Sequence, residues 1–228
     1  HIDTLAPGLI RDTSKCILCG RCIARCSNAH GMGILGFENR GFNTFVAPAE
    51  NRSFADSPCI QCGQCVNVCP VGAITGVSYV KKVWAAICDP TKTVIVQTAP
   101  AVRVAVGQEF GFKAGEPVTG KLVAGLKALG FDKVFDTDFS ADLTIMEEGT
   151  ELVNRVKEGK NLPILTSCCP GWINFLEHHY PDLLDIPSSC KSPQQMFGAV
   201  AKTYYAEKIG VDPKNLVVVS IMPCQAKK

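Results

Sequence analysis

The sequence predicts a small α+β domain followed by an α/β domain with a mostly parallel sheet, and two observations lead to this division. A cysteine motif occurs twice in the first part of the chain, which indicates two related units that complete each other. From residue 90 onward, apolar runs rich in β-branched residues alternate with segments of helical pattern. We therefore predict domains of residues 1–89 and 90–228.

The duplicated motif has the spacing C-x2-C-x2-C-x3-C. Its first copy extends from Cys16 to Cys26 and its second from Cys59 to Cys69, and each copy has a glycine after its second cysteine. The segment 27–58 between them is rich in Gly, Asn and Phe and is expected to be loop with short strands.

This spacing favours iron–sulfur chemistry. Three thiolates on a tight turn can bind three irons of a cubane, and in two-cluster ferredoxins the fourth cysteine of each run serves the other cluster. A pair of structural zinc sites is the alternative, but zinc rarely needs four cysteines in one short run twice over. An odd total of 13 cysteines cannot be fully paired as disulfides. We predict a ferredoxin-like domain with two 4Fe-4S clusters, one held by Cys16, Cys19, Cys22 and Cys69 and the other by Cys59, Cys62, Cys65 and Cys26.

The second domain opens with the apolar strand Thr93–Gln97. A helix over about 117–129 that stops at Gly130 is expected next, followed by a strand Lys133–Asp136. After them we expect a helix that is capped by Ser140 or Asp142 and stops at Gly159, and then a strand Leu162–Leu165. The remaining expected elements are a helix after Pro170, a helix from Ser192 and Pro193 to Gly210, and a strand Leu216–Ile221.

Ligands of parallel sheets bind beyond the carboxyl ends of the strands. Three expected strands end in unusual sequences, at 99–101, 166–169 and 222–224. If these strands are parallel neighbours, their ends converge on one crevice lined by cysteine.

Composition excludes some classes of partner. A formal charge of +2 without a basic stripe gives no indication of nucleic-acid binding. No apolar run approaches the length of a membrane span, so we expect a soluble protein, located in the cytoplasm with the periplasm left open. The chain starts at His1 and stops at Lys228 directly after a cysteine motif, so both ends are expected to be cut.

Two further segments carry a family resemblance. Residues 166–172 read TSCCPGW and residues 221–228 read IMPCQAKK, downstream of the double cysteine motif. Together they resemble the signature motifs of the iron-only (FeFe) hydrogenases. The resemblance covers the chain from Cys16 to Lys228, including the segments 141–148 and 188–195.

The resemblance implies an active site called the H-cluster, a 4Fe-4S cubane joined to a di-iron unit with CO, cyanide and a bridging dithiolate. Cys169 and Cys224 resemble two of the four cubane ligands, and Cys168 resembles the thiol that relays protons. Lys227 matches the residue that donates a hydrogen bond to a cyanide. The pocket wall is matched by Ala99, Pro100, Ala101, Gln194 and Met222. The family takes its other two cubane ligands from a later motif that this sequence lacks, so turnover is expected only where those ligands are supplied.

The resemblance also implies a proton relay. Glu148, Glu151 and Arg155 share one face of the expected helix, a pattern that alone indicates a solvated, salt-bridged surface. With Ser188, they match the family's proton path, and we expect burial to raise the glutamate pKa values toward neutrality. Cys88 and Cys190 match no ligand position and are predicted to be small buried hydrophobes.

The predicted function is the reversible reduction of protons to H2. A noncatalytic hydrogenase-like protein of iron–sulfur assembly or sensing, or an electron carrier alone, is the alternative, and the presence of Cys168 favours the enzyme. Expected partners are the remaining C-terminal part of the hydrogenase and ferredoxin or another redox subunit, such as an NADH- and flavin-using or formate dehydrogenase module.

Overall fold

The computed structural model describes residues 2–228, which form two compact units. The first unit contains residues 2–78 together with Cys169–Leu184 and Cys224–Lys228. The second unit contains Tyr79–Cys168 and Asp185–Pro223. Both later cysteine motifs therefore contribute a segment to the first unit. The predicted domain boundary near residue 89 stays a prediction.

The first unit is built on two small antiparallel sheets. Strands β1 (Ile2–Asp3), β2 (Leu9–Asp12) and β5 (Ile74–Gly76) form one sheet in the order β1-β2-β5. Strands β3 (Gly36–Glu38) and β4 (Phe45–Ala47) pair within the predicted loop segment. The core beneath them is formed by Ala6, Leu9, Cys22, Leu35, Val46, Phe54 and Ile74.

The helices of the first unit are short. They are α1 (Arg21–Ala24) with the π-helical turn Arg25–Ala29, α2 (Gln64–Val68), α7 (Pro170–His179), and the 3-10 turns Thr13–Lys15, Gly41–Asn43, Ala49–Asn51, Pro181–Leu183 and Gln225–Lys227. Because α1 and α2 each start within one copy of the cysteine motif, the sequence repeat is also a structural repeat.

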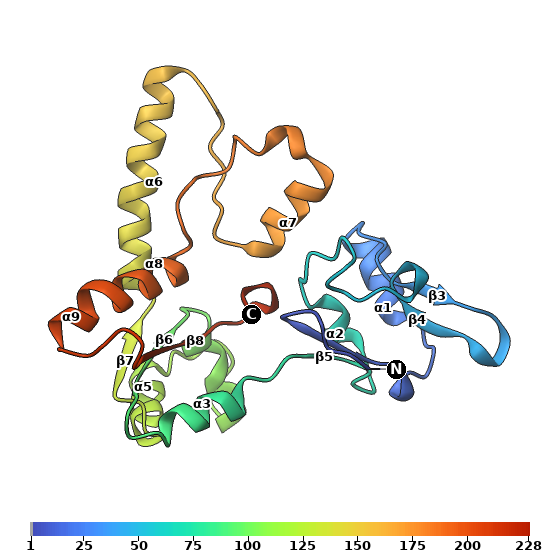
Figure 1. The fold of residues 1–228 in the computed structure, drawn as a ribbon, viewed down its shortest axis with the longest axis horizontal. Helices are drawn as coiled ribbons and strands as arrows, with labels where there is room; N and C mark the ends of the chain where they lie inside the picture. The colour runs from blue at the N-terminus through green and yellow to red at the C-terminus, as the bar shows by residue number, and fades with distance from the viewer. Residues whose placement is uncertain (1) are drawn as a thin grey trace. The chain divides into compact units, whose positions relative to one another are not determined.

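The second unit contains the predicted parallel sheet (Figure 1). Strand β6 (Thr93–Thr98) lies between β7 (Lys133–Asp136) and β8 (Leu216–Ile221), and both pairings are parallel. The helices are α3 (Val80–Ile87), α4 (Val102–Ala105), the 3-10 turn Val106–Phe110, α5 (Thr119–Ala128), α6 (Asp138–Glu158), α8 (Pro193–Val200), the π-helical turn Ala201–Tyr205 and α9 (Ala206–Lys208). In Figure 1, α8 and α9 cover one face of the sheet, and α3 and α5 cover the other.

Strand β6 is the middle strand of the sheet, and its residues are buried on both faces. Ile95 packs against Phe197, Ala201 and Leu216. On the other face, Val94 and Val96 pack in a cluster with Leu126 and Phe131. A continuous apolar run of this kind is what a parallel strand covered by helices requires.

One polar side chain lies inside this core. Gln97 is 1% exposed, and its amide Nε2 donates to the carbonyl oxygen of Gln194 at 3.1 Å and to Oγ of Ser220 at 2.8 Å. Its Oε1 accepts a hydrogen bond of 3.1 Å from the hydroxyl of Thr137. Gln97 therefore joins β6, β8 and the starts of α6 and α8, beneath the carboxyl ends of the strands.

The start of α6 differs from the prediction. The helix begins at Asp138, and Ser140 is fully buried inside it rather than capping it. The cause lies in the preceding strand, because Oδ1 of Asp136 accepts the N–H of Asp138 at 3.0 Å. Arg103 then binds the carboxylates of both Asp136 and Asp138. The predicted stop at Gly159 is correct, with this glycine at φ 67°.

The predicted strand Leu162–Leu165 is wrong. This segment makes a single parallel bridge, between Leu165 and Pro187, and is no strand of the β7-β6-β8 sheet. Proline has no N–H to donate, and prolines at 163 and 187 interrupt both sides of this pairing. Only two of the three expected strand ends, those after β6 and β8, therefore belong to neighbouring strands of the sheet.

Candidate metal centres and active site

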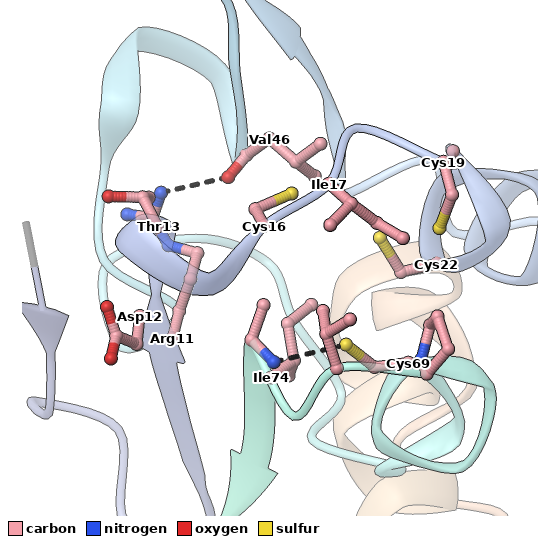
Figure 2. Close-up of a pocket in the computed structure, with 14 residues that line it drawn as sticks. Arg11, Asp12, Thr13, Cys16, Ile17, Cys19, Cys22, Val46, Cys69 and Ile74 are labelled. Atoms are coloured by element: carbon pink, nitrogen blue, oxygen red, sulfur yellow. Dashed lines mark hydrogen bonds between the residues drawn. The ribbon is translucent and has the colours of Figure 1, made fainter.

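Four cysteines surround a hollow of the first unit (Figure 2). Cys16, Cys19, Cys22 and Cys69 line this hollow, whose other walls include Ile17, Val46 and Ile74. The pKa of the Cys22 thiol is raised to about 11, mainly by burial and in smaller part by the neighbouring thiols of Cys16, Cys69 and Cys19. Three of these cysteines belong to the first motif and the fourth belongs to the second.

A second hollow repeats this arrangement. Cys26, Cys59, Cys62 and Cys65 line it together with Leu9, Leu35 and Phe54. Burial raises the pKa of Cys59 to about 11 and that of Cys65 to about 12. The structure thus brings together the four thiols of each predicted set, including the two cysteines that cross over.

These surroundings fit iron–sulfur clusters. A thiolate in an apolar cavity is unfavourable without a cationic partner, and deprotonation becomes favourable when a metal binds the sulfur. Each hollow offers four thiols, the number that a 4Fe-4S cluster takes. The cluster assignment of these eight cysteines nevertheless stays a prediction.

The two motif loops have the same unusual backbone. Leu18 and Gly20 have φ angles of 56° and 71°, and the matching residues Gln61 and Gly63 have 53° and 75°. The left-handed region costs a non-glycine residue about 1 kcal/mol, so Leu18 and Gln61 are held there by the fold. In the second loop, the N–H of Gln61 donates to Sγ of Cys59 at 3.4 Å.

The two crossing cysteines, Cys69 and Cys26, have different local backbones. Burial raises the pKa of Cys69, but the N–H groups of Ile74, Val71, Ala73 and Gly72 outweigh it, and the pKa is lowered. The N–H of Ala73 lies 3.2 Å from this sulfur. Cys26 instead lies within the π-helical turn Arg25–Ala29. Cys26 is followed by Ser27 and Cys69 is followed by Pro70, and the backbone around the two cysteines differs.

The TSCCPGW segment marks the start of α7. Cys169 is the N-cap residue and Pro170 is the first residue of the helix. A Cβ added at Gly171 would lie 3.8 Å from Sγ of Cys169 and 3.7 Å from Cβ of Ala226. The C-terminal segment that contains Cys224 therefore packs next to Cys169 within the first unit. Cys168, the neighbouring residue, is exposed, and Lys227 is partly buried.

Three of the predicted proton-relay residues, Glu151, Arg155 and Ser188, meet in the second unit. Oε2 of Glu151 accepts a hydrogen bond of 2.7 Å from the Ser188 hydroxyl, and Oε1 accepts one of 2.6 Å from Arg155. Glu148, one turn earlier on α6, is partly buried.

The expected rise in the glutamate pKa is wrong for Glu151. Burial alone raises it, but hydrogen bonds from Ser188, the N–H of Ser189 and Arg155 outweigh burial and lower the pKa to about 2. Glu151 is therefore a fixed carboxylate at neutral pH.

The predicted pocket-wall residues lie at one edge of the sheet. Ala99 follows β6 directly and its N–H donates to the carbonyl oxygen of Ile221 at 3.1 Å. Met222 follows β8, which is the parallel neighbour of β6. The carbonyl oxygen of Gln194 is held by Gln97. Pro100 and Ala101 complete the turn into α4.

Neither unassigned cysteine is the buried hydrophobe that we predicted. Cys88 is exposed at the end of α3. Cys190 is partly buried, with its Sγ 3.7 Å from Oε2 of Glu151. Its place in the Glu151 network required knowledge of the long-range contact between α6 and the segment around Ser188.

Comparison with known families identifies the fold. Residues 92–228 match the model of the iron only hydrogenase large subunit, C-terminal domain, and residues 15–73 match that of the 4Fe-4S dicluster domain. The chain belongs to the iron-only hydrogenase large-subunit family. Its first part is a 4Fe-4S dicluster region, and its second part is an α/β region with a three-stranded parallel sheet.

Individual relatives agree with this membership. The NADP-reducing hydrogenase subunit HndD of Solidesulfovibrio fructosivorans is 55% identical over 98% of this chain and 39% of its own length. Iron hydrogenase 1 of Clostridium pasteurianum is 45% identical over 100% of this chain and 40% of its own length. A structure of apo [FeFe]-hydrogenase HydA1 from Chlamydomonas reinhardtii matches with a TM-score of 0.63 and 53% identity, over 66% of this chain and 39% of that chain.

The chain thus spans about two fifths of the length of these hydrogenases. No helix among residues 2–228 is long and apolar enough to cross a membrane.

Proposed function

We propose that this chain forms the electron-relay region and part of the active site of a hydrogenase that reversibly reduces protons to H2. The observation that carries the proposal is the pair of four-thiol hollows, each completed by a cysteine from the other motif, in a chain of the iron-only hydrogenase family. Two such clusters in one small unit pass electrons one at a time.

The ligands of the active site come from two segments. Cys169 and Cys224 would hold part of the H-cluster, and its remaining ligands would come from the C-terminal part of the hydrogenase. When bound, the H-cluster would supply the metal centre at which protons and electrons combine. Lys227 would donate a charge-assisted hydrogen bond to it. Ala99, Pro100, Ala101, Gln194 and Met222 match the family's pocket wall.

We propose a proton path through side chains of the second unit. Cys168 holds a proton on its Sγ and exchanges it with Glu148. Glu151, kept ionised by Arg155 and the N–H of Ser189, accepts the hydrogen bond of Ser188 and so fixes the direction of that hydroxyl. Since the Ser188 oxygen also accepts the N–H of Cys190 at 3.1 Å, it is held from both sides.

The electron donor is proposed to be ferredoxin or another redox subunit with an acidic surface. Residues 13–37 and 57–78, which contain both cysteine motifs, carry Lys15, Arg21 and Arg25 but no Asp or Glu. Arg21 and Arg25 are exposed and line an open hollow whose wall includes Cys69, a proposed ligand of the first cluster. Opposite charge at such a surface speeds encounter and orients the partner.

The identity of the donor and the location are inferred from chemistry and relatives. The relative HndD is named as a subunit of an NADP-reducing hydrogenase, which supports an NAD(P)-linked module as a redox partner, alongside ferredoxin or a formate dehydrogenase module. We propose a cytoplasmic location and leave the periplasm open.

The test uses the complete hydrogenase that contains this chain. Its iron content and the infrared bands of CO and cyanide are measured beside H2 evolution. We expect both band types, and we expect Cys168→Ala or Glu148→Gln to lower H2 evolution by orders of magnitude with the iron content unchanged. Cys88→Ala, at an exposed thiol of the same unit, is the control and should leave turnover unchanged.

Two results would contradict the proposal. About eight irons without CO or cyanide bands would mean that only the two ferredoxin-type clusters are present, as in an electron carrier or a noncatalytic relative. Wild-type turnover in both relay variants would discard the proton path.

A further inference from the structure

Three glycines from distant parts of the first unit surround Gln225, two of them at its side chain and one at its backbone. A Cβ added at Gly76 would lie 2.6 Å from Nε2 and 2.8 Å from Oε1 of Gln225. A Cβ at Gly63 would overlap Cγ of Gln225, and one at Gly8 would lie 2.8 Å from its carbonyl oxygen. Real Cβ contacts are essentially never shorter than 3.0 Å. The slot around Gln225 therefore exists because all three positions lack a side chain.

The backbone around Gln225 is held as well. Its carbonyl oxygen accepts the N–H of Lys228 at 3.1 Å, and Nζ of Lys228 donates to the carbonyl oxygen of Val77 at 2.6 Å. The N–H of Val77 in turn donates to the carbonyl oxygen of Gly8 at 3.0 Å. The C-terminal segment is thus tied to the end of the β2–β5 strand pair, beside Gly8 and Gly76.

The Gln225 amide is enclosed without being used as an acceptor. Within residues 2–228, its Oε1 is buried and has no hydrogen-bond partner. A buried amide without a partner is unfavourable, so hydrogen bonding does not explain this side chain's position. The Cβ and Cγ atoms of Gln225 fill the space beside Gly63, so steric packing holds this side chain in place.

The position of the slot connects two proposed sites. Gly63 is the glycine of the second cysteine motif, between Cys62 and Cys65, and it begins α2. Gln225 directly follows Cys224. The side chain of Gln225 therefore lies against the loop of one proposed cluster. Its backbone is joined by one peptide bond to Cys224, a proposed ligand of the H-cluster cubane.

We propose that Gln225 is a positioning residue of the electron path, whose side chain holds the Cys224 segment against the Cys59–Cys65 loop by filling the slot between Gly63 and Gly76. This inference rests on the proposed function. Electron tunnelling falls steeply with the separation of donor and acceptor and favours packed contact over a gap. A side chain that closes this gap therefore sets the rate at which electrons cross it.

The packing is tested with a double-mutant cycle in the complete, cluster-loaded hydrogenase. Gly76→Ala alone clashes with the Gln225 amide, and we expect it to lower the melting temperature. Gln225→Ala together with Gly76→Ala removes the clash and should recover part of this loss. Gly8→Ala is the matched control, because its clash is with the backbone of residue 225, which Gln225→Ala leaves in place. If both double variants behave alike, the side chain does not fill the slot.

The electron path has its own readout. Gln225→Ala is expected to slow electron transfer from the reduced dicluster region to the active site by tenfold or more, while isotope exchange between D2 and water, which needs no outside electrons, changes by less than twofold. Gln225→Met keeps the volume of the side chain and should restore the rate, because no hydrogen bond is lost. The electron paramagnetic resonance signal of the cluster held by Cys59, Cys62, Cys65 and Cys26 should shift, and that of the other cluster should not.

Each way of failing is distinct. Equal losses of electron transfer and isotope exchange in Gln225→Ala would show a general structural role and overturn the inference. The same holds if Gln225→Met fails to restore the rate. If instead the wild-type protein shows no CO or cyanide bands and no isotope exchange, the proposed function fails, while the double-mutant cycle still reports on the slot.

Discussion

The Ser188 hydroxyl donates a hydrogen bond of 2.7 Å to Oε2 of Glu151, across 37 residues of sequence. The same carboxylate binds Arg155, four residues later on α6, and the N–H of Ser189. Arg155 also donates to the carbonyl oxygens of Ile186 and Pro187, at 2.7 and 2.8 Å. The proposed proton path is therefore built on an ion pair that fastens the segment around Ser188 to α6.

The pH dependence of stability is predicted from Glu151. Its folded-state pKa of about 2 lies below the ordinary value of 4.5, so its stabilising contribution is complete above about pH 4.5 and is lost as the pH falls toward 2. We expect the melting temperature of the wild type to drop more steeply than that of Glu151→Gln between pH 5 and pH 2. Glu147→Gln, at an exposed neighbouring position, should show the wild-type slope. Parallel curves for all three proteins would show that the carboxylate is not anchored.

The crossed ligand sets lead to a second prediction. Because Cys69 lines the hollow of Cys16, Cys19 and Cys22, Cys69→Ala should damage the first cluster and leave the second intact. Cys26→Ala should do the reverse. Iron analysis and electron paramagnetic resonance of the reduced protein distinguish the two clusters, and Cys88→Ala serves as the control. Loss of the second cluster in Cys69→Ala would mean that each motif keeps its own fourth cysteine.

Much of this architecture could be predicted from local sequence. The strands Lys133–Asp136 and Leu216–Ile221 occur with the predicted bounds, because short β-branched runs between turn signals define their own ends. The cysteine quartets can be recognised from sequence because cysteines at this spacing on a tight turn can bind neighbouring irons of one cubane. The prediction of a strand at 162–165 failed because strand pairing depends on the partner segment, and here the partner segment contains Pro187.

The features that could not be predicted from the sequence depend on contacts between segments far apart in the chain. The low pKa of Glu151 needs Ser188 and Ser189, which no helical periodicity places beside it. The glycine slot needs Gly8, Gly63 and Gly76 at one point, and each of them alone is an ordinary turn or motif residue. Gln97 did leave a signal, as a polar residue within a run of buried apolar ones.

Gln97 should be important for the stability of the second unit. Gln97→Leu removes its hydrogen bonds and leaves the buried hydroxyl of Thr137 and the carbonyl oxygen of Gln194 without this partner. Leaving a buried polar group without its partner costs about 1–3 kcal/mol, so we expect a fall of about 2 kcal/mol in the free energy of unfolding. Urea denaturation checks this, with Gln108→Leu at an exposed position as the control. An unchanged midpoint in Gln97→Leu would contradict the structural role.

Charge reversal tests where the electron donor binds. Arg21 and Arg25 are exposed on α1 and the adjoining turn, beside the hollow that reaches Cys69, and Arg25 donates to Oε1 of Gln64 on α2 at 3.0 Å. Replacing both by Glu should slow reduction of the protein by an acidic ferredoxin about tenfold at low ionic strength, and added salt should narrow the difference, because salt screens exposed charges. Lys127→Glu with Lys157→Glu makes the same change in net charge at exposed positions of the second unit and should have little effect. Equal slowing by both pairs would show that net charge alone matters, and the hollow beside Cys69 would then not be the docking surface.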